Sequence, residues 1–128
     1  MSLGMYLAVA TGGALGAMAR YSVTLFVGGG IFGVAGPLAT IMVNIAGSAL
    51  MGVFAGAVAG GMVVPEAWRG FFAVGFLGAL TTFSSFAFDA GTLIQKQGMG
   101  LTLIYIGASI ALSLAAFGLC FLAMRGAQ

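Results

Sequence analysis

The chain has 128 residues, of which 62% are hydrophobic and 5% are charged, and its formal net charge is +2. A soluble domain carries roughly 25% charged residues, so this composition leaves too little polar surface to face water. No charged residue occurs between Arg20 and Glu66 or between Lys96 and Arg125, and both stretches exceed the ~20 apolar residues that span a bilayer. The composition therefore excludes a soluble globular domain and predicts an integral membrane protein.

Four membrane-spanning helices are predicted within one domain, residues 1–128. We expect the spans at residues 3–27, 37–60, 68–95 and 99–124. Glycine, proline and charge mark the breaks, in "GGGIFGVAGP", "GGMVVPEAWRG" and "KQGMG". Helices are favoured over strands because each run is too long for a barrel strand, lacks strict alternation, and must pair its backbone amides internally in lipid.

Small residues recur at a spacing of four in the first two spans, as in "GGALGAMA" and "GSALMGVFAG". In a membrane, faces of small residues let helix backbones approach one another closely. The 23 glycines of the chain therefore predict closely packed helices, either within one bundle or in an oligomer.

The basic residues favour neither orientation in the membrane. With four spans, Arg69 and Arg125 lie on the side of the termini, and Arg20 and Lys96 lie on the opposite side. Because an excess of Lys and Arg determines which side stays cytoplasmic, we expect dual topology, with oppositely inserted copies paired antiparallel. The alternative is a single orientation, which follows if Arg20 at membrane depth is not counted during insertion.

Several polar side chains fall at bilayer depth, where burial is costly and usually functional. They are Arg20 in the first span, Asn44 in the second, and Thr102, Tyr105, Ser109 and Ser113 in the fourth. A Ser or Thr often bonds only to its own helix, and an Asn, with four hydrogen-bonding sites, can serve as packing glue or as pore lining. The only candidate carboxylate for proton coupling, Asp89, lies toward the end of the third span, which favours passive conduction over proton-coupled transport. With no histidine and one cysteine, no transition-metal site is expected.

The segment "GFLGALTTFSSF", residues 75–86, predicts a break in the third span near residues 78–82, because its glycines and paired threonines weaken the helix. Broken backbone is tolerated at membrane depth only where it is buried in protein or lines a cavity. The carbonyls ending the first half would favour a cation, and the free amides starting the second half would favour an anion. Phe83 and Phe86 share a face beyond the break, where their positive ring edges suit a small anion; ordinary aromatic packing is the alternative.

Together with "GGALGAMARY", "TIMVNIAGS" and "YIGASIALS", this segment resembles the Fluc family of fluoride channels, also called CrcB-type proteins. The resemblance covers all four spans in order. It implies an all-α, antiparallel dual-topology homodimer with two fluoride pathways along the subunit boundary and a structural sodium ion (Na+) at the broken third helices. It also implies a fluoride-selective channel, not an enzyme, that exports cytoplasmic fluoride passively across a prokaryotic-type inner membrane. The implied partners are a second copy, fluoride and lipid, with no nucleic acid.

The resemblance also implies the site residues, position by position. It places an amide, two aromatic rings and a track of hydroxyls in the fluoride pathway: Asn44, Phe83 and Phe86, and Ser109 and Ser113. We expect two further polar residues, Thr82 and Tyr105, to belong to the same pathway. The backbone carbonyls of Gly78 and Thr81 are expected to bind the sodium ion. Arg20 is given a structural role.

Three positions depart from the family pattern. Many relatives have Gly where this chain has Ala79, Thr where it has Ser85, and Glu where it has Asp89. A methyl group at residue 79 bears on close approach at the dimer centre, although ligation by a carbonyl does not require glycine there. The role of Asp89 is left open.

Two other functions are weighed against the channel. A proton-coupled transporter of the small multidrug-resistance type also has four spans and dual topology, but its mid-first-span glutamate is absent here. A non-conducting membrane assembly subunit would explain the glycines without explaining the intramembrane Asn and hydroxyls.

Overall fold

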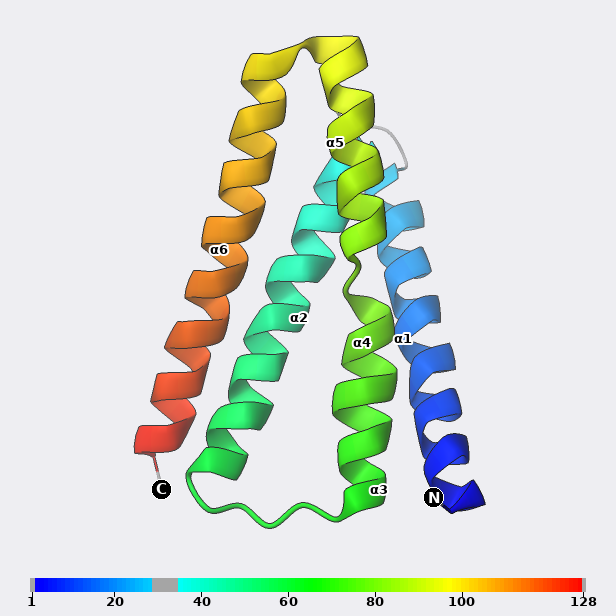
Figure 1. Ribbon diagram of the computed structural model, residues 1–128, viewed down its shortest axis with the longest axis vertical. Helices are drawn as coiled ribbons and strands as arrows, with labels where there is room; N and C mark the ends of the chain where they lie inside the picture. Colours follow the sequence, from blue (N-terminus) through cyan, green and yellow to red (C-terminus); the bar gives the residue numbers. More distant parts are fainter. Residues whose placement is uncertain (1, 29–34, 128) are drawn as a thin grey trace.

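The computed structural model describes residues 2–28 and 35–127, and all regular structure in these ranges is helical (Figure 1). The elements are α1 (Leu3–Gly28), α2 (Ala35–Ala59), α3 (Glu66–Arg69), the π-helix η1 (Gly70–Leu77), α4 (Gly78–Leu80), α5 (Phe83–Gln97) and α6 (Met99–Gly126). The elements α3, η1, α4 and α5 follow one another and together form the third helical segment, Glu66–Gln97. The four helical segments begin and end within about two residues of the expected spans, inside the usual uncertainty of helix ends. Most of "GGGIFGVAGP" lies outside the described residues.

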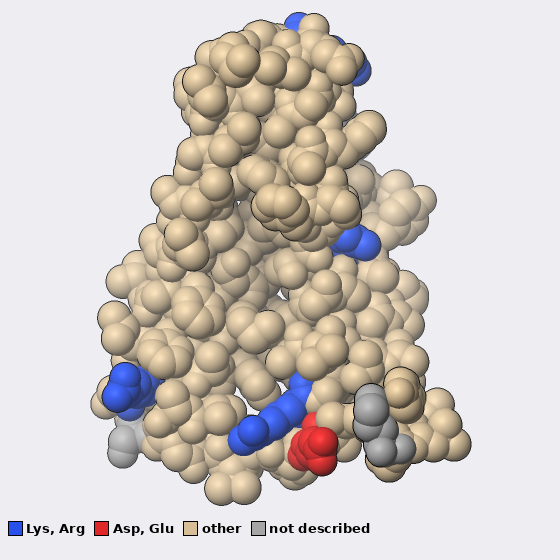
Figure 2. Space-filling model, viewed as in Figure 1, with Lys and Arg blue, Asp and Glu red and all other residues tan. Residues whose placement is uncertain are grey.

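Three of these segments are long and apolar enough to cross a membrane: Gly36–Ala59, Glu66–Gln97 and Met99–Gly126. Helix α1 has 26 residues, which is sufficient length for a bilayer, but it carries Arg20 and is not one of the three. Figure 2 shows a face that is almost entirely uncharged. The prediction of a multi-pass, all-helical membrane protein is confirmed, while a membrane crossing by α1 stays a prediction.

Helix α1 begins and helix α6 ends at the same end of the bundle (Figure 1). The α2–α3 connection lies at that end too. Arg69, at the end of α3, and Arg125, near the end of α6, belong to that end. Lys96 lies near the α5–α6 turn at the opposite end, and Arg20 lies in the half of α1 nearer to it. This arrangement has the two-against-two distribution of charge that the sequence predicts; how the copies insert stays a prediction.

Glycines set a close approach between α1 and η1. Gly12 lies against the backbone carbonyl of Phe71, and Gly16 lies against that of Phe76, so the two segments run in the same direction. A Cβ atom at either glycine would overlap the carbonyl oxygen. The close packing predicted for "GGALGAMA" is confirmed.

Helix α2 packs against α6 by the same means. Gly52 lies against the carbonyl of Phe117, and Gly56 lies against that of Phe121, so these helices are also parallel. Both glycine pairs have the small-xxx-small spacing that brings membrane helices together. The fold is therefore two closely packed parallel pairs, with α5 packed against α2 and α6.

The third segment breaks at Thr81 and Thr82, inside the predicted range. Both residues are extended, with φ −81° and ψ 155° at Thr81 and φ −156° and ψ 123° at Thr82. Figure 1 shows the chain leaving α4 and starting α5 after a short unwound stretch. Leu77 and Leu80 of the first half pack with Val43 of α2 in the buried core, which holds the break against α2.

Candidate functional site

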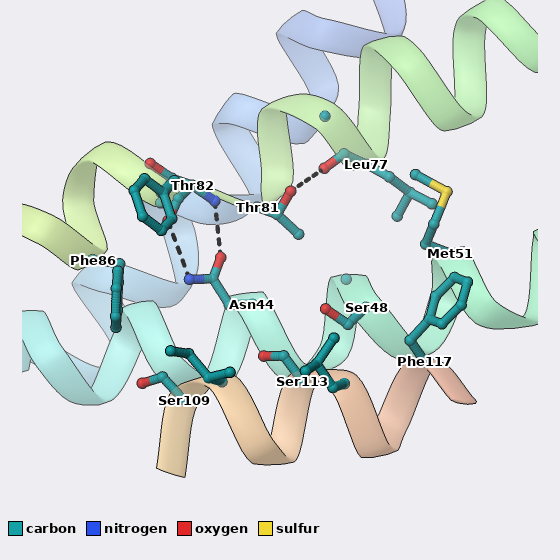
Figure 3. A pocket seen from close by; sticks show the side chains of 15 residues that line it. Asn44, Ser48, Met51, Leu77, Thr81, Thr82, Phe86, Ser109, Ser113 and Phe117 are labelled. Atoms are coloured by element: carbon teal, nitrogen blue, oxygen red, sulfur yellow. Dashed lines mark hydrogen bonds between the residues drawn. The ribbon is translucent and has the colours of Figure 1, made fainter. Parts of the chain in front are cut away.

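A cavity of about 610 Å³ lies beside the break, bordered by α2, α4, α5 and α6 (Figure 3). Its lining includes most of the residues predicted for the anion path and the cation site: Asn44, Gly78, Thr81, Thr82, Phe83, Phe86, Ser109 and Ser113. No charged residue is among those that line it. The structure therefore brings the two predicted sites into one place, and the role of each residue there stays a prediction.

Asn44 bonds to both backbone polar groups of Thr82 (Figure 3). Its Oδ1 accepts a hydrogen bond from the Thr82 N–H at 2.8 Å, and its Nδ2 donates to the Thr82 carbonyl at 3.1 Å. Because an Asn amide carries two N–H donors, one hydrogen is left for another acceptor. The packing role that the sequence left open is thus observed, and the pore-lining role stays a prediction.

The break deprives two backbone carbonyls of their helical partners. In a continuous α-helix the Thr82 N–H would donate to the Gly78 carbonyl, and the Ser85 N–H would donate to the Thr81 carbonyl. Here the Thr82 N–H bonds to Asn44, and the Ser85 N–H bonds to Thr82 Oγ1 at 3.2 Å. Both carbonyls that the sequence assigns to a cation therefore lie where the helical hydrogen bonds are interrupted.

Thr82 also caps the start of α5. Its Oγ1 accepts from the Ser85 N–H and lies 3.2 Å from Ser84 Oγ and 3.3 Å from Ser85 Oγ. Such a side-chain oxygen satisfies one of the amides that a helix start leaves unpaired. Of the free amides expected there to favour an anion, the amide of Ser85 is already used.

Phe83 and Phe86 lie on one face of α5, as predicted, with ring centroids 5.4 Å apart and planes at 42°. The Phe86 ring stacks on Tyr105 of α6, at 5.5 Å and 29°. Phe83 is 79% exposed and so has little packing within the chain. Aromatic packing therefore places Phe86 between Phe83 and Tyr105, with Phe83 at the exposed end, and contact between ring edges and an anion stays a prediction.

Ser109 and Ser113 lie one turn apart on α6 and both line the cavity (Figure 3). The Ser109 hydroxyl is buried and finds no hydrogen-bond partner within the described residues. Tyr105 does not line the cavity; its buried hydroxyl lies near Ser109 and Asp89.

Arg20 lies apart from this cavity. It lines a second space of about 170 Å³ together with Tyr21, Thr24, Thr40, Thr82 and Ser85, among others. Thr82 thus contributes to both spaces, one on each side of the break. The structural role assigned to Arg20 stays a prediction.

Two features of the site were missed from the sequence. Ser48 lines the cavity one turn after Asn44, and its spacing of four on the same helix was a signal that could have found it. Thr40 Oγ1 donates to Asp89 Oδ2 at 2.6 Å, and both side chains are buried. Asp89 Oδ1 also lies close to Gly36, in the first turn of α2. The aspartate left open above therefore ties α5 to the start of α2.

The fold and the site define a multi-pass helical membrane protein with an uncharged, largely apolar cavity at a broken helix, into which a few amide and hydroxyl groups project. Residues 7–121 match the model of the family described as CrcB-like protein, Camphor Resistance (CrcB). The chain is 42% identical over 123 residues to "Fluoride-specific ion channel FluC" of Saccharophagus degradans, covering 90% of this chain and 85% of that one. It is 45% identical over 109 residues to the protein of that name from Rhodospirillum centenum, covering 85% and 86%.

A third relative of the same name, from Cereibacter sphaeroides, is 44% identical over 125 residues, with 94% of each chain covered. These matches span nearly the whole chain on both sides. The chain belongs to the CrcB-like family, whose relatives are named as ion channels and not as enzymes. The family resemblance inferred from the sequence motifs is confirmed.

Proposed function

We propose that the chain is a fluoride-selective channel that conducts passively. The observation that carries this proposal is the cavity at the break, whose polar lining consists of hydroxyls, an amide and backbone, with no carboxylate to repel an anion. A small, strongly hydrated anion needs replacement hydrogen-bond donors when it leaves water, and pore selectivity is set by such linings. The relatives named as fluoride-specific channels share 42–45% identity with this chain, which supports fluoride as the ion.

Three polar side chains and two aromatic rings of the lining have roles in this proposal. The free N–H of Asn44 Nδ2 donates to fluoride, and the hydroxyls of Ser109 and Ser113 rotate to donate as the ion passes. The edges of Phe83 and Phe86 carry partial positive charge and stabilise the anion without holding it as tightly as a full charge would. Conduction requires binding weak enough for release, which neutral donors provide.

The working unit in this proposal is an antiparallel homodimer of two oppositely inserted copies. Extended backbone at membrane depth must be buried in protein or line a cavity, because lipid offers no hydrogen bonds. Within one chain the cavity beside the break remains open, and the exposed Phe83 ring lies at it. A second copy laid against this side would enclose both the cavity and the ring. The balanced charges of the two ends permit the opposite insertion that such pairing needs.

A sodium ion between the two copies completes the proposal. The carbonyls of Gly78 and Thr81 lie at the interruption of the helix, and paired chains would contribute four neutral oxygens. Oxygen ligands suit a hard cation, and neutral carbonyls would not offset the reluctant dehydration of magnesium, so a monovalent ion fits better. The residues present are therefore suited to hold sodium, and its contribution is to neutralise the mutual repulsion of the carbonyls.

The cellular role follows from acid chemistry. Hydrogen fluoride crosses membranes as a neutral weak acid, ionises in a more alkaline cytoplasm and is trapped there as an anion. A passive fluoride path in the inner membrane of a prokaryotic cell releases this trapped anion and lowers its toxicity.

Fluoride efflux from proteoliposomes tests this function. The purified chain is reconstituted with internal fluoride, the membrane potential is short-circuited with an ionophore, and external fluoride is followed with an electrode. We expect efflux that exceeds that of protein-free vesicles and does not depend on a proton gradient. Efflux that requires a proton gradient would favour the transporter, and absence of efflux would favour the assembly subunit.

A further inference from the structure

The N–H of Thr82 has two possible acceptors, and the third segment is a continuous helix only if this N–H donates to the acceptor in its own helix. In an unbroken helix it would donate to the Gly78 carbonyl four residues earlier. In the structure it donates instead to Asn44 Oδ1, while Asn44 Nδ2 donates back to the Thr82 carbonyl. One side chain from α2 thereby bonds to both the backbone N–H and the backbone carbonyl of Thr82 at the break.

We infer that Asn44 is a positioning residue that holds the third segment open and so keeps the Gly78 carbonyl available to a cation. This inference rests on the sodium site of the proposed function. An unpaired backbone group at membrane depth is costly, so the break is tolerated only if Thr82 finds partners elsewhere. Asn44 offers an acceptor and a donor on one planar group, which a hydroxyl or an apolar side chain at this position cannot match.

The surface of α2 is shaped to receive the broken backbone. Thr81 and Thr82 are extended, so the polar groups of Thr82 point sideways, as they do in a strand that pairs with a neighbour. Three residues after Asn44, Gly47 leaves room for the Thr81 methyl group, which a Cβ atom at residue 47 would overlap. The Thr81 hydroxyl in turn donates to the Leu77 carbonyl at 2.9 Å and closes the end of α4. Two neighbouring positions on α2 therefore fit the same two residues of the break.

The arrangement links the cation site to the anion path. Two hydrogen bonds to Thr82 fix the orientation of the Asn44 amide, and hence the direction of its remaining N–H. A cation on the Gly78 carbonyl would oppose the return of the Thr82 N–H to that oxygen, and so would favour the same amide orientation. Since coupling between two sites is reciprocal, a change at Asn44 that removes the acceptor of the Thr82 N–H should weaken the response of the protein to the cation.

The test compares the thermal unfolding of the purified protein in sodium chloride and in the chloride of a large organic cation. We expect sodium to raise the unfolding midpoint of the wild type. Asn44→Leu removes both acceptor and donor, so the difference between the two cations should fall to less than half. Ser48→Ala is the matched control, because it removes a polar group from the same cavity and the same helix face without touching Thr82; it should keep the wild-type difference.

Asn44→Asp keeps an acceptor for the Thr82 N–H and loses the donor, so it should retain the response to sodium even while fluoride efflux falls. A full sodium response in Asn44→Leu would overturn the inference. If Asn44→Leu does not assemble, loss of the response in Asn44→Asp would overturn it instead, and retention supports it. A wild type with no response to sodium refutes the cation site and this inference together, whereas the separate efflux assay decides whether the fluoride channel stands.

Discussion

Replacing Thr40 with valine should destabilise the protein through the buried carboxyl group of Asp89. Thr40 Oγ1 donates to Asp89 Oδ2 at 2.6 Å, and the two residues are only 8% and 7% exposed. Valine keeps the shape of threonine and removes the donor. Leaving a buried acceptor unsatisfied costs about 1–3 kcal/mol, and more when the group is charged. Asp89 Oδ1 keeps its place beside the first turn of α2, where the helix dipole favours negative charge, so we expect a loss of about 1–2 kcal/mol.

Unfolding of the purified protein in mixed detergent micelles measures this difference. Thr92→Val is the matched control, because among the described residues Thr92 Oγ1 bonds only to the Phe88 carbonyl of its own helix, at 3.0 Å. That change should lie within about 0.5 kcal/mol, as is usual away from buried polar pairs. Thr40→Ser retains a hydroxyl and should recover much of the stability. A Thr40→Val loss no larger than that of Thr92→Val would show that the buried pair does not stabilise the fold.

Three further predictions concern the anion path and the helix packing. Phe86→Ile removes the ring edges with little change in size and should lower fluoride efflux about five-fold, since aromatic electrostatics contribute ~1 kcal/mol; wild-type efflux would contradict the ring-edge role. Ser109→Ala and Ser113→Ala should each be mild because either hydroxyl can serve the ion, and a double variant as mild as the singles would argue against a hydroxyl track. Gly16→Ala places a methyl group against the η1 backbone and should lower the unfolding free energy by about 1–3 kcal/mol. Gly91→Ala, where a Cβ atom meets nothing within 4 Å, should not destabilise, and equal losses in both would refute the packing argument.

The helices and the break could be predicted because their signals are local. Long apolar runs and the glycine and proline between them define helix ends within about two residues. The paired threonines lie at the break itself, since the hydroxyls of Thr81 and Thr82 each bond to nearby backbone and compete with the helix. Residues spaced three or four apart on one helix, such as Ser109 and Ser113, also reach the same cavity.

Contacts between distant segments could not be predicted in the same way. Thr40 and Asp89 are 49 positions apart, and neither residue type shows which partner it will find. The sequence left two roles open for Asn44, because an amide can bond to backbone or to a ligand. Its bonds to backbone depend on the position of Thr82 against α2, which the sequence does not specify. The π-helical geometry of η1 was likewise missed, because no spacing of its residues distinguishes it from an α-helix.

Under the proposed function, the broken third segment would let a neutral site serve two ions of opposite charge. A charged side chain at membrane depth is expensive, and none lines the cavity. Interrupting one helix supplies polarity from the backbone instead: the carbonyls of Gly78 and Thr81 lose their helical donors, while the start of α5 gains donors of its own. Under the proposed function, the carbonyls face the cation and the amide and hydroxyls face fluoride. The hydrogen bonds of Asn44 to Thr82 lie between these two sets of groups. The break at bilayer depth therefore falls in the least lipid-like stretch of the chain, where both ions of the proposed function would bind.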